Sequence, residues 1–347
     1  MADPFSHLAL PLETQPMEAK LAAEIPADEG WQFEPKWDGF RCLAFRDGGT
    51  AELMSKSGKP LGRYFPEIVE ALLGLRERRL VLDGELVLPV GDVLSFAALQ
   101  LRLHPAASRI EKLSRETPAQ LMLFDALQIG AQQLADRPLA KRREALEAFM
   151  ARADDPRLLL SPRATDRRAA ERWFAQTGGA LDGVIAKRLD QPYRFGERAM
   201  VKVKQLRAAD CVVGGFRYAE KKREVGSLLL GLYDDDGKLH HVGFTSGISA
   251  KERAALTERL EALIKPPGFT GNAPGGPSRW NTARTGQWEP LKPELVVEVR
   301  YDQVTGRRFR HGTALLRWRP DKAPKQCTFE QLAPELKPSE IKELFAG

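Results

Sequence analysis

The sequence predicts an α+β protein in two parts, of which the second is a β-barrel of the OB type. Between residues 31 and 90, short apolar runs with period-two alternation, such as residues 80–88, are typical of strands, and a helical pattern over residues 66–78 interrupts them. After Arg207, several strands and one helix follow in a short length of chain, which is typical of an OB barrel. The 347 residues suffice for two domains, each with a hydrophobic core.

The first part mixes helices with these strands. A proline-rich stretch, residues 1–20, is expected to be irregular. Beyond the helix at residues 66–78, two more are predicted at residues 139–153 and 166–176. The last begins at a favourable N-cap residue, Asp166.

The second part is dominated by strands, which we predict at residues 211–216, 227–233, 240–244 and 295–301. The segment from Asp234 to Gly237 indicates a hairpin turn, because Asp-Gly is a strong hairpin signal. Ser249 and Glu252 form a capping box that predicts a helix to about Ile264. Residues 268–292 are rich in Gly, Pro and Trp and are expected to form a loop.

The charge is uneven along the chain. The net charge is +6, and from Arg207 onward there are 23 Lys and Arg against 18 Asp and Glu, compared with 30 and 29 before it. A basic second part favours a polyanionic partner such as nucleic acid. Ordinary solubilising charge remains an alternative on these numbers alone.

Several classes of protein are disfavoured. No apolar run approaches transmembrane length and the N-terminus lacks a signal-peptide pattern, so we expect a cytoplasmic protein without a membrane partner. The three cysteines lie far apart without metal-ligand spacing, which indicates reduced thiols. The five histidines form no recognisable motif, and the absence of a Gly-x-x-x-x-Gly-Lys-Ser/Thr loop argues against a P-loop ATPase.

A series of short motifs carries the functional information. Lys-x-Asp-Gly alone is commonly a surface turn, and each of the other motifs is equally unspecific. Together they keep a fixed order: Lys36–Gly39, Ser55–Lys59, Leu82–Leu86, Leu123–Ala126, Asp182–Lys187, Val201–Lys204 and Arg319–Pro324. This series resembles the nucleotidyl-transfer motifs of ATP-dependent DNA ligases, over about residues 16–337. The resemblance is strongest to small stand-alone bacterial ligases, akin to the ligase module of bacterial end-joining enzymes.

The resemblance implies a fold and a nucleophile. It implies an ATP-grasp-like nucleotidyltransferase domain of antiparallel sheets with helices at residues 1–207, followed by an OB-fold domain at residues 208–347. Lys36 would attack the α-phosphate of ATP, and nearby cations would favour its neutral amine. Lys202 and Lys204 face the same side of a strand and could supply that field, although a half-buried strand with a solvated face would show the same pattern. By resemblance both also bind the α-phosphate.

Two carboxylates are implied as metal ligands. Glu85 would contact the ribose and help to position Mg²⁺, which Mn²⁺ could replace, and Asp182 is the second candidate ligand. Asp182 stands where the family commonly has glutamate, so ligation could run through water. Without the resemblance, Glu85 would read as a solvated acid on an edge strand and Asp182 as part of a turn.

Other residues are implied in nucleotide binding. Phe124 would stack on adenine. Glu34 is a further candidate, since it stands where family backbone groups contact adenine; a merely exposed side chain is the alternative. Arg41 would bind the nucleotide and then the 5′-phosphate of the nick, because its fork suits phosphate. Lys187 belongs to the motif that begins at residue 182, and Lys56 replaces the arginine that many ligases carry.

The last motif implies a moving second domain. Arg319 and Lys322 would close over the ATP tail and orient pyrophosphate for departure. We expect the hinge near residues 207–210. A charged C-terminal turn is the alternative.

The sequence therefore predicts an ATP-dependent DNA ligase that seals 3′-hydroxyl/5′-phosphate nicks through lysyl-AMP and DNA-adenylate. Expected partners are nicked or broken duplex DNA and end-joining or repair proteins, and the enzyme is expected to act as a monomer. The alternatives are an RNA ligase, an mRNA-capping nucleotidyltransferase, and a non-catalytic nucleic-acid-binding protein.

Overall fold

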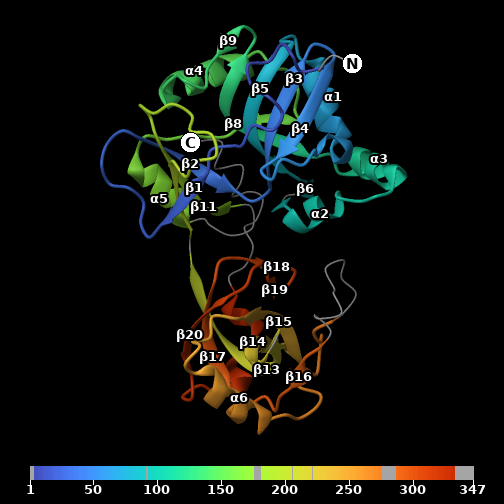
Figure 1. Ribbon diagram of the computed structural model, residues 1–347, viewed down its shortest axis with the longest axis vertical. Coiled ribbons are helices and arrows are strands. Elements are labelled where there is room, and N and C mark those ends of the chain that lie inside the picture. The colour runs from blue at the N-terminus through green and yellow to red at the C-terminus, as the bar shows by residue number, and fades with distance from the viewer. Residues whose placement is uncertain are drawn as a thin grey trace. The chain divides into compact units, whose positions relative to one another are not determined.

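The computed structural model describes residues 4–90, 93–175, 181–204, 206–220, 222–275 and 287–332. The chain folds into two compact units that divide between residues 205 and 206. Figure 1 labels the elements of each unit.

The first unit contains two sheets. One has four strands in the order β1 (Ala19–Ala22), β12 (Met200–Val203), β11 (Leu181–Arg188) and β2 (Trp31–Trp37). The other runs β10 (Leu158–Leu160), β8 (Gln120–Ile129), β5 (Arg79–Val87), β3 (Phe40–Asp47) and β4 (Thr50–Ser55), with β9 (Gln132–Gln133) paired to β8. Most pairs are antiparallel, but β1 and β10 join their neighbours in parallel.

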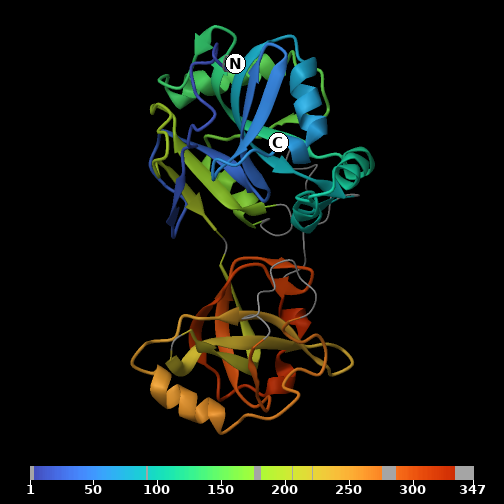
Figure 2. The same ribbon diagram turned by 45° about the vertical axis from the view of Figure 1, so that its right-hand side comes forward.

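Helices cover the outer faces of these sheets. α5 (Arg167–Ala175) contacts β2 and β11, whereas α4 (Leu139–Met150) contacts β8 and α1 (Pro66–Gly74) contacts β4. Figure 2 shows α1 alongside the strands of the larger sheet. Leu43, Phe45 and Val81 face the other way and pack with Ile185 and Met200 of the smaller sheet. The inner faces of the two sheets therefore meet, and they leave a cavity at one end.

Smaller elements complete the first unit. These are η1 (Gly62–Tyr64), β6 (Pro89–Val90), β7 (Val93–Leu94), α2 (Phe96–Leu101) and α3 (Ala107–Glu116). The sequence did not predict α2 and α3, which are short helices that follow the antiparallel pair of β6 and β7. It also extended the irregular lead-in to residue 20, whereas β1 begins at Ala19.

The second unit is an antiparallel sheet that curves into an OB-type barrel. Its order is β15 (Leu239–Thr245), β14 (Lys222–Tyr233), β13 (Arg207–Ala219), β17 (Val296–Tyr301) and β20 (Ala314–Trp318), and β16 (Glu289–Pro290) pairs with β13. A bridge between Thr245 and Thr313 brings the two edges together. The remaining elements are α6 (Arg253–Glu261), β18 (Val304–Thr305), β19 (Arg308–Phe309), η2 (Pro324–Gln326) and η3 (Phe329–Gln331).

The capping box predicted in this unit is wrong. α6 begins at Arg253 with Glu252 as its N-cap and no side-chain cap hydrogen bond. The Glu252 N–H instead donates to the backbone oxygen of Ser249, so the two residues form a backbone turn before the helix. Part of the loop predicted at residues 268–292 lies outside the described residues.

All three cysteines are free and buried. Cys42 lies in the core of the first unit, and Cys211 and Cys327 share the core of the second. Burial raises the pKa of each thiol, to about 12 for Cys327.

Candidate active site

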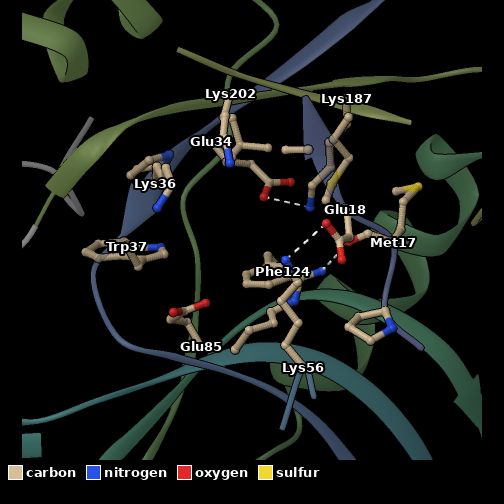
Figure 3. Close-up of a pocket in the computed structure, with 16 residues that line it drawn as sticks. Met17, Glu18, Glu34, Lys36, Trp37, Lys56, Glu85, Phe124, Lys187 and Lys202 are labelled. Atoms are coloured by element: carbon tan, nitrogen blue, oxygen red, sulfur yellow. Dashed lines mark hydrogen bonds and ion pairs between the residues drawn. The ribbon is translucent and has the colours of Figure 1, made fainter. Parts of the chain in front are cut away.

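A cavity of about 200 Å³ lies in the first unit, between the facing sides of its two sheets. Strands β1, β2, β11 and β12 supply one wall, and β3, β5 and β8 supply the other (Figure 3). Its lining includes Glu34, Lys36, Arg41, Lys56, Glu85, Phe124, Lys187 and Lys202. Residues from Pro16 to Lys202 therefore share one cavity, because both sheets present alternate side chains inward.

Lys36 lies near the end of β2, in contact with an acid. Its Nζ is 2.7 Å from Oδ2 of Asp182, and Nζ of Lys204 is 2.9 Å from the same oxygen. Asp182 thus links the proposed nucleophile to one of its two cationic neighbours. From the sequence, Asp182 was predicted to be a metal ligand, and its contact with the two lysines was not predicted.

Lys202 is the second cationic neighbour. It pairs across the sheet with Ile185, which in turn pairs with Glu34, so the three side chains form a row on the cavity face. Burial lowers the pKa of Lys202, and the positive charges of Lys36 and Lys204 lower it further. This cluster of amines is suited to binding the negative charge of a phosphate.

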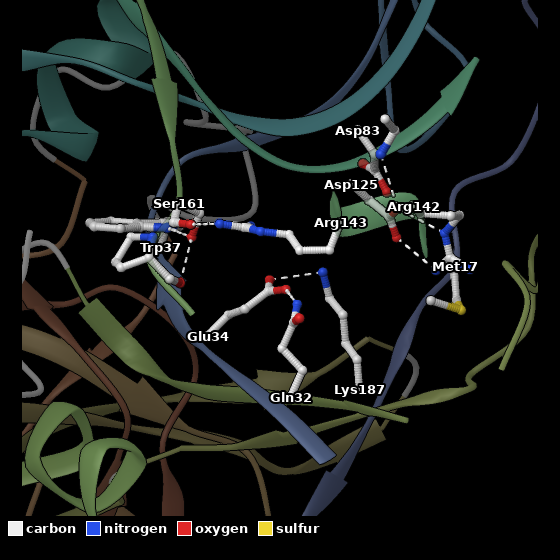
Figure 4. Close-up of polar contacts among 12 residues, drawn as sticks. Met17, Gln32, Glu34, Trp37, Asp83, Asp125, Arg142, Arg143, Ser161 and Lys187 are labelled. Atoms are coloured by element: carbon white, nitrogen blue, oxygen red, sulfur yellow. Dashed lines mark hydrogen bonds and ion pairs between the residues drawn. The ribbon is translucent and has the colours of Figure 1, made fainter. Parts of the chain in front are cut away.

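Glu34, two residues before Lys36 on β2, belongs to a buried polar group with Gln32 and Lys187. Glu34 is 2% exposed, so the alternative of a merely exposed side chain is wrong. Its Oε2 lies 2.8 Å from Nζ of Lys187, and its Oε1 accepts a hydrogen bond of 2.7 Å from the amide of Gln32 (Figure 4). The antiparallel register explains this group, because it places Lys187 directly opposite Gln32.

Phe124 forms an aromatic wall beside this group. Lys187 Nζ lies 4.5 Å from the ring centroid, and Cζ of Arg41 lies 4.6 Å from the same centroid. Only 7% of Phe124 is exposed. A flat apolar surface next to a fixed donor and acceptor is suited to a heteroaromatic base.

Arg41 is held from behind by Asp83. Its Nε and Nη2 donate to the two carboxylate oxygens of Asp83 at 2.6 Å each. The Tyr193 hydroxyl also donates to Asp83, at 2.6 Å, and accepts from the backbone N–H of Met17 at 2.9 Å. Tyr193 therefore links Asp83, the partner of Arg41, to the segment that leads into β1. Nothing in the sequence pattern singled out Asp83 in this role, or Tyr193 at all.

The remaining acids and bases line the mouth of the cavity. Lys56 Nζ is 3.0 Å from Glu18 Oε2. Burial raises the pKa of Glu85 to about 7, although Lys36 and Arg41 act in the opposite direction. Within the described ranges, no cluster of three or more His, Cys, Asp or Glu could hold a metal ion.

Arg319 and Lys322 belong to the second unit. Arg319 Nη1 is 2.8 Å from Oδ1 of Asp210, and its Nη2 is 2.8 Å from Oδ2 of Asp321. Lys322 Nζ lies 3.6 Å from Asp210. Both cations are thus held by local acids of their own unit.

Comparisons with known proteins agree on one family. A family model described as "ATP dependent DNA ligase domain" matches residues 16–204, and one described as "ATP dependent DNA ligase C terminal region" matches residues 221–322. The chain is 47% identical over 333 residues to a protein of Mycolicibacterium smegmatis named DNA ligase C2, covering 91% of this chain and 93% of that protein.

Two further similarities extend this result. A Mycobacterium tuberculosis protein named "Multifunctional non-homologous end joining DNA repair protein LigD" is 31% identical over 345 residues, which are 97% of this chain and 40% of that protein. A solved structure titled "mycobacterial DNA ligase D complexed with ATP and MES" matches with a TM-score of 0.50 and 29% identity, over 91% of this chain and 98% of that one. No helix in the described part of the chain is long and apolar enough to cross a membrane.

Proposed function

Because the chain belongs to the family of ATP-dependent DNA ligases, we propose that it seals nicks in duplex DNA with Lys36 as the nucleophile. One observation carries the assignment of Lys36. Its amine lies on the lining of a cavity that also offers an aromatic wall, a paired donor and acceptor, and a cluster of cations. The other lysines on the cavity lining are proposed to bind the nucleotide as cations, which leaves Lys36 as the attacking amine.

The first step is transfer of adenylate to the protein. The Lys36 nitrogen forms a bond to the α-phosphorus of ATP, the bond from that phosphorus to the bridging oxygen breaks, and pyrophosphate leaves. Lys202 and Lys204 stabilise the charge that develops on the phosphoryl oxygens. Asp182 orients the Lys36 amine before nucleotide binds.

Two further steps complete the reaction. An oxygen of the 5′-phosphate of the nick forms a bond to the adenylate phosphorus, the bond from that phosphorus to the Lys36 nitrogen breaks, and the Lys36 amine leaves. Arg41 holds the 5′-phosphate through its fork. The 3′-hydroxyl then attacks the 5′-phosphorus, a phosphodiester forms, and AMP leaves. Asp83 keeps Arg41 oriented for both nucleotide and nick.

Mg²⁺, for which Mn²⁺ can substitute, is the metal that suits this site. Glu85 and Asp182 would hold it with phosphate oxygens, since Mg²⁺ needs only one or two carboxylates and keeps several waters. The raised pKa of Glu85 fits a position at which a cation is expected, because its own surroundings do not fully compensate the charge. When bound, the metal would neutralise phosphate charge.

DNA is the proposed macromolecular partner. Contacts to its phosphates from both units would be only weakly specific for sequence. The relative named for non-homologous end joining supports a place in repair of broken ends, with repair proteins as partners. We place the enzyme in the bacterial cytoplasm as a monomer. The relatives described above are DNA ligases and give no support to the RNA-ligase, capping or non-catalytic alternatives.

Incubation with α-labelled ATP and Mg²⁺ tests the nucleophile. Wild-type protein should take up one label per chain, and Lys36→Ala should take up none, because no other amine occupies the attacking position. Lys20→Ala is a suitable control, since Lys20 is exposed on β1 of the same sheet and does not line the cavity. Label that remains on Lys36→Ala would exclude Lys36 as the nucleophile.

A further inference from the structure

Gln32 is a buried polar residue that the ligase motifs do not include. It lies on β2, two residues before Glu34, and has no exposed surface. Its amide nitrogen donates to Glu34 Oε1 at 2.7 Å, which is its one side-chain hydrogen bond in the described structure. Its amide oxygen is buried and has no hydrogen-bond partner among the described residues. If the Gln32 amide held other parts of the core together, we would expect both its oxygen and its nitrogen to have hydrogen-bond partners there.

Each of the two carboxylate oxygens of Glu34 has a partner that holds it in place. Gln32 binds one oxygen and Lys187 the other, at 2.7 and 2.8 Å. An amide N–H can only donate, so the Glu34 oxygen that it contacts is held as an acceptor. Glu34 therefore reaches the cavity as an acceptor, and Lys187 beside it as a donor.

This pair distinguishes the two common purines. Adenine carries a 6-amino donor next to an N1 acceptor, whereas guanine carries a 6-oxo acceptor next to an N1–H donor. The acceptor oxygens of Glu34 and the donor amine of Lys187 complement the first pattern and oppose the second. A Glu34 side chain free to rotate would lose this preference.

We infer that Gln32 is a positioning residue that sets the selectivity of the ligase for ATP, by holding Glu34 as an acceptor for the 6-amino group. The inference rests on the proposed function, since it assigns the base end of the same cavity. Gln32 does not line the cavity and acts only through Glu34.

The test compares two nucleotides on two variants. α-Labelled ATP and α-labelled purine riboside triphosphate, which lacks the 6-amino group, are each used to label wild-type protein and Gln32→Met, a substitution of similar volume without a donor. The maximal rate of labelling and the apparent dissociation constant are measured for each. Wild type should prefer ATP, and Gln32→Met should lose about 10-fold of that preference through weaker ATP binding, with maximal rates within about 2-fold. Gln133→Met, an exposed glutamine on β9, should behave as wild type.

Two results would overturn the inference. One is a Gln32→Met variant that keeps the wild-type preference. The other is an equal loss of maximal rate with both nucleotides, which a purely structural role would give. Both differ from failure of the proposed function itself, in which wild type would take no label from ATP.

A second variant covers the case in which Gln32→Met fails to fold. Gln32→Glu places two carboxylates together, and they must share a proton before one can donate to the other. Its ATP labelling rate relative to wild type at the same pH should rise as the pH falls from 8 to 6. A ratio that does not change with pH would contradict the positioning role.

Discussion

The Glu85 carboxyl shows how the cavity alters a single residue. It lies on β5 at the mouth of the cavity, where burial raises its pKa from 4.5 to about 7. Between these values the folded protein binds more protons than the unfolded chain, so stability falls as pH rises through this range. The proposed metal ligand Glu85 is thus placed where its ionised form destabilises the nucleotide-free protein.

Replacing Glu85 should increase the stability of the protein and decrease its activity. Glu85→Gln should raise the free energy of unfolding at pH 8 by roughly 1–2 kcal/mol and change little at pH 4.5, because only the ionised carboxylate is unfavourable. It should also depress nick sealing. Urea unfolding at the two pH values checks the first point, with the exposed carboxylate Glu13→Gln as control. A variant that is no more stable at pH 8 would contradict the placement of an uncompensated charge.

Side-chain types and strand periodicity predicted much of the cavity at the residue scale. Lys36, Arg41, Glu85 and Phe124 were named from ordered motifs, and the structure places them on one lining. The sequence could not predict that Glu34 is buried. That depends on Lys187 lying across from its strand, and periodicity gives the face of a side chain but not its partner.

At the scale of elements, one buried ion pair fastens α4 to the larger sheet. Arg142 on α4 and Asp125 on β8 are each 1% exposed, and Nε and Nη2 of the arginine donate to both carboxylate oxygens at 2.8 and 2.9 Å. Arg142 also donates to the backbone oxygen of Arg137 at 2.7 Å. The pair sits one residue from Phe124, so α4 supports the aromatic wall of the cavity.

Removing one member of this pair should be costly. Arg142→Met leaves Asp125 buried and unpaired, which should destabilise the first unit by about 3–5 kcal/mol. Hydrogen exchange of the α4 and β8 amides measures the loss. Lys141→Met is the matched control, because Lys141 is exposed and its pair with Glu144 contributes about 0.5 kcal/mol or less. Unchanged protection in Arg142→Met would show that the pair does not hold the helix.

Elements with strong patterns were predicted more readily than short ones. The apolar alternation of residues 80–88 predicted a strand that the structure has as β5, and α1 and α4 lie within the predicted helical ranges. The hinge near residues 207–210 stays a prediction: the division between the units directly precedes these residues, which belong to β13, where Arg207 pairs with Tyr301 and Asp210 with Glu298. Those residues carry no turn signal, and their pairing is with a strand about 90 positions later, which local sequence cannot reveal.

At the scale of the whole molecule, the proposed reaction uses residues from both units. Lys36 lies in the first and Arg319 in the second, and a family model matches each part. Arg319 is held by Asp210 and Asp321, which keep its guanidinium charged and oriented. We therefore expect Arg319 to act on bound ATP only in the first step.

Arg319→Ala should affect the steps unequally. Self-adenylylation should fall by about 100-fold, since the cation that orients pyrophosphate is lost, while sealing of pre-adenylylated nicked DNA should fall by less than about 10-fold. Single-turnover assays on the two substrates measure this. Arg317→Ala removes an equal charge nearby and should leave both rates near wild type. Equal losses in the two assays would remove the proposed role of Arg319 in the first step.

The burial of the three native thiols allows each unit to be labelled selectively with a dye. Maleimides react with accessible thiolates, and Cys42, Cys211 and Cys327 offer neither access nor thiolate at neutral pH. Dyes directed to one cysteine introduced on the surface of each unit should therefore attach there and leave the native positions unmodified. Energy transfer between those dyes could then be followed through every turnover in the otherwise unaltered protein.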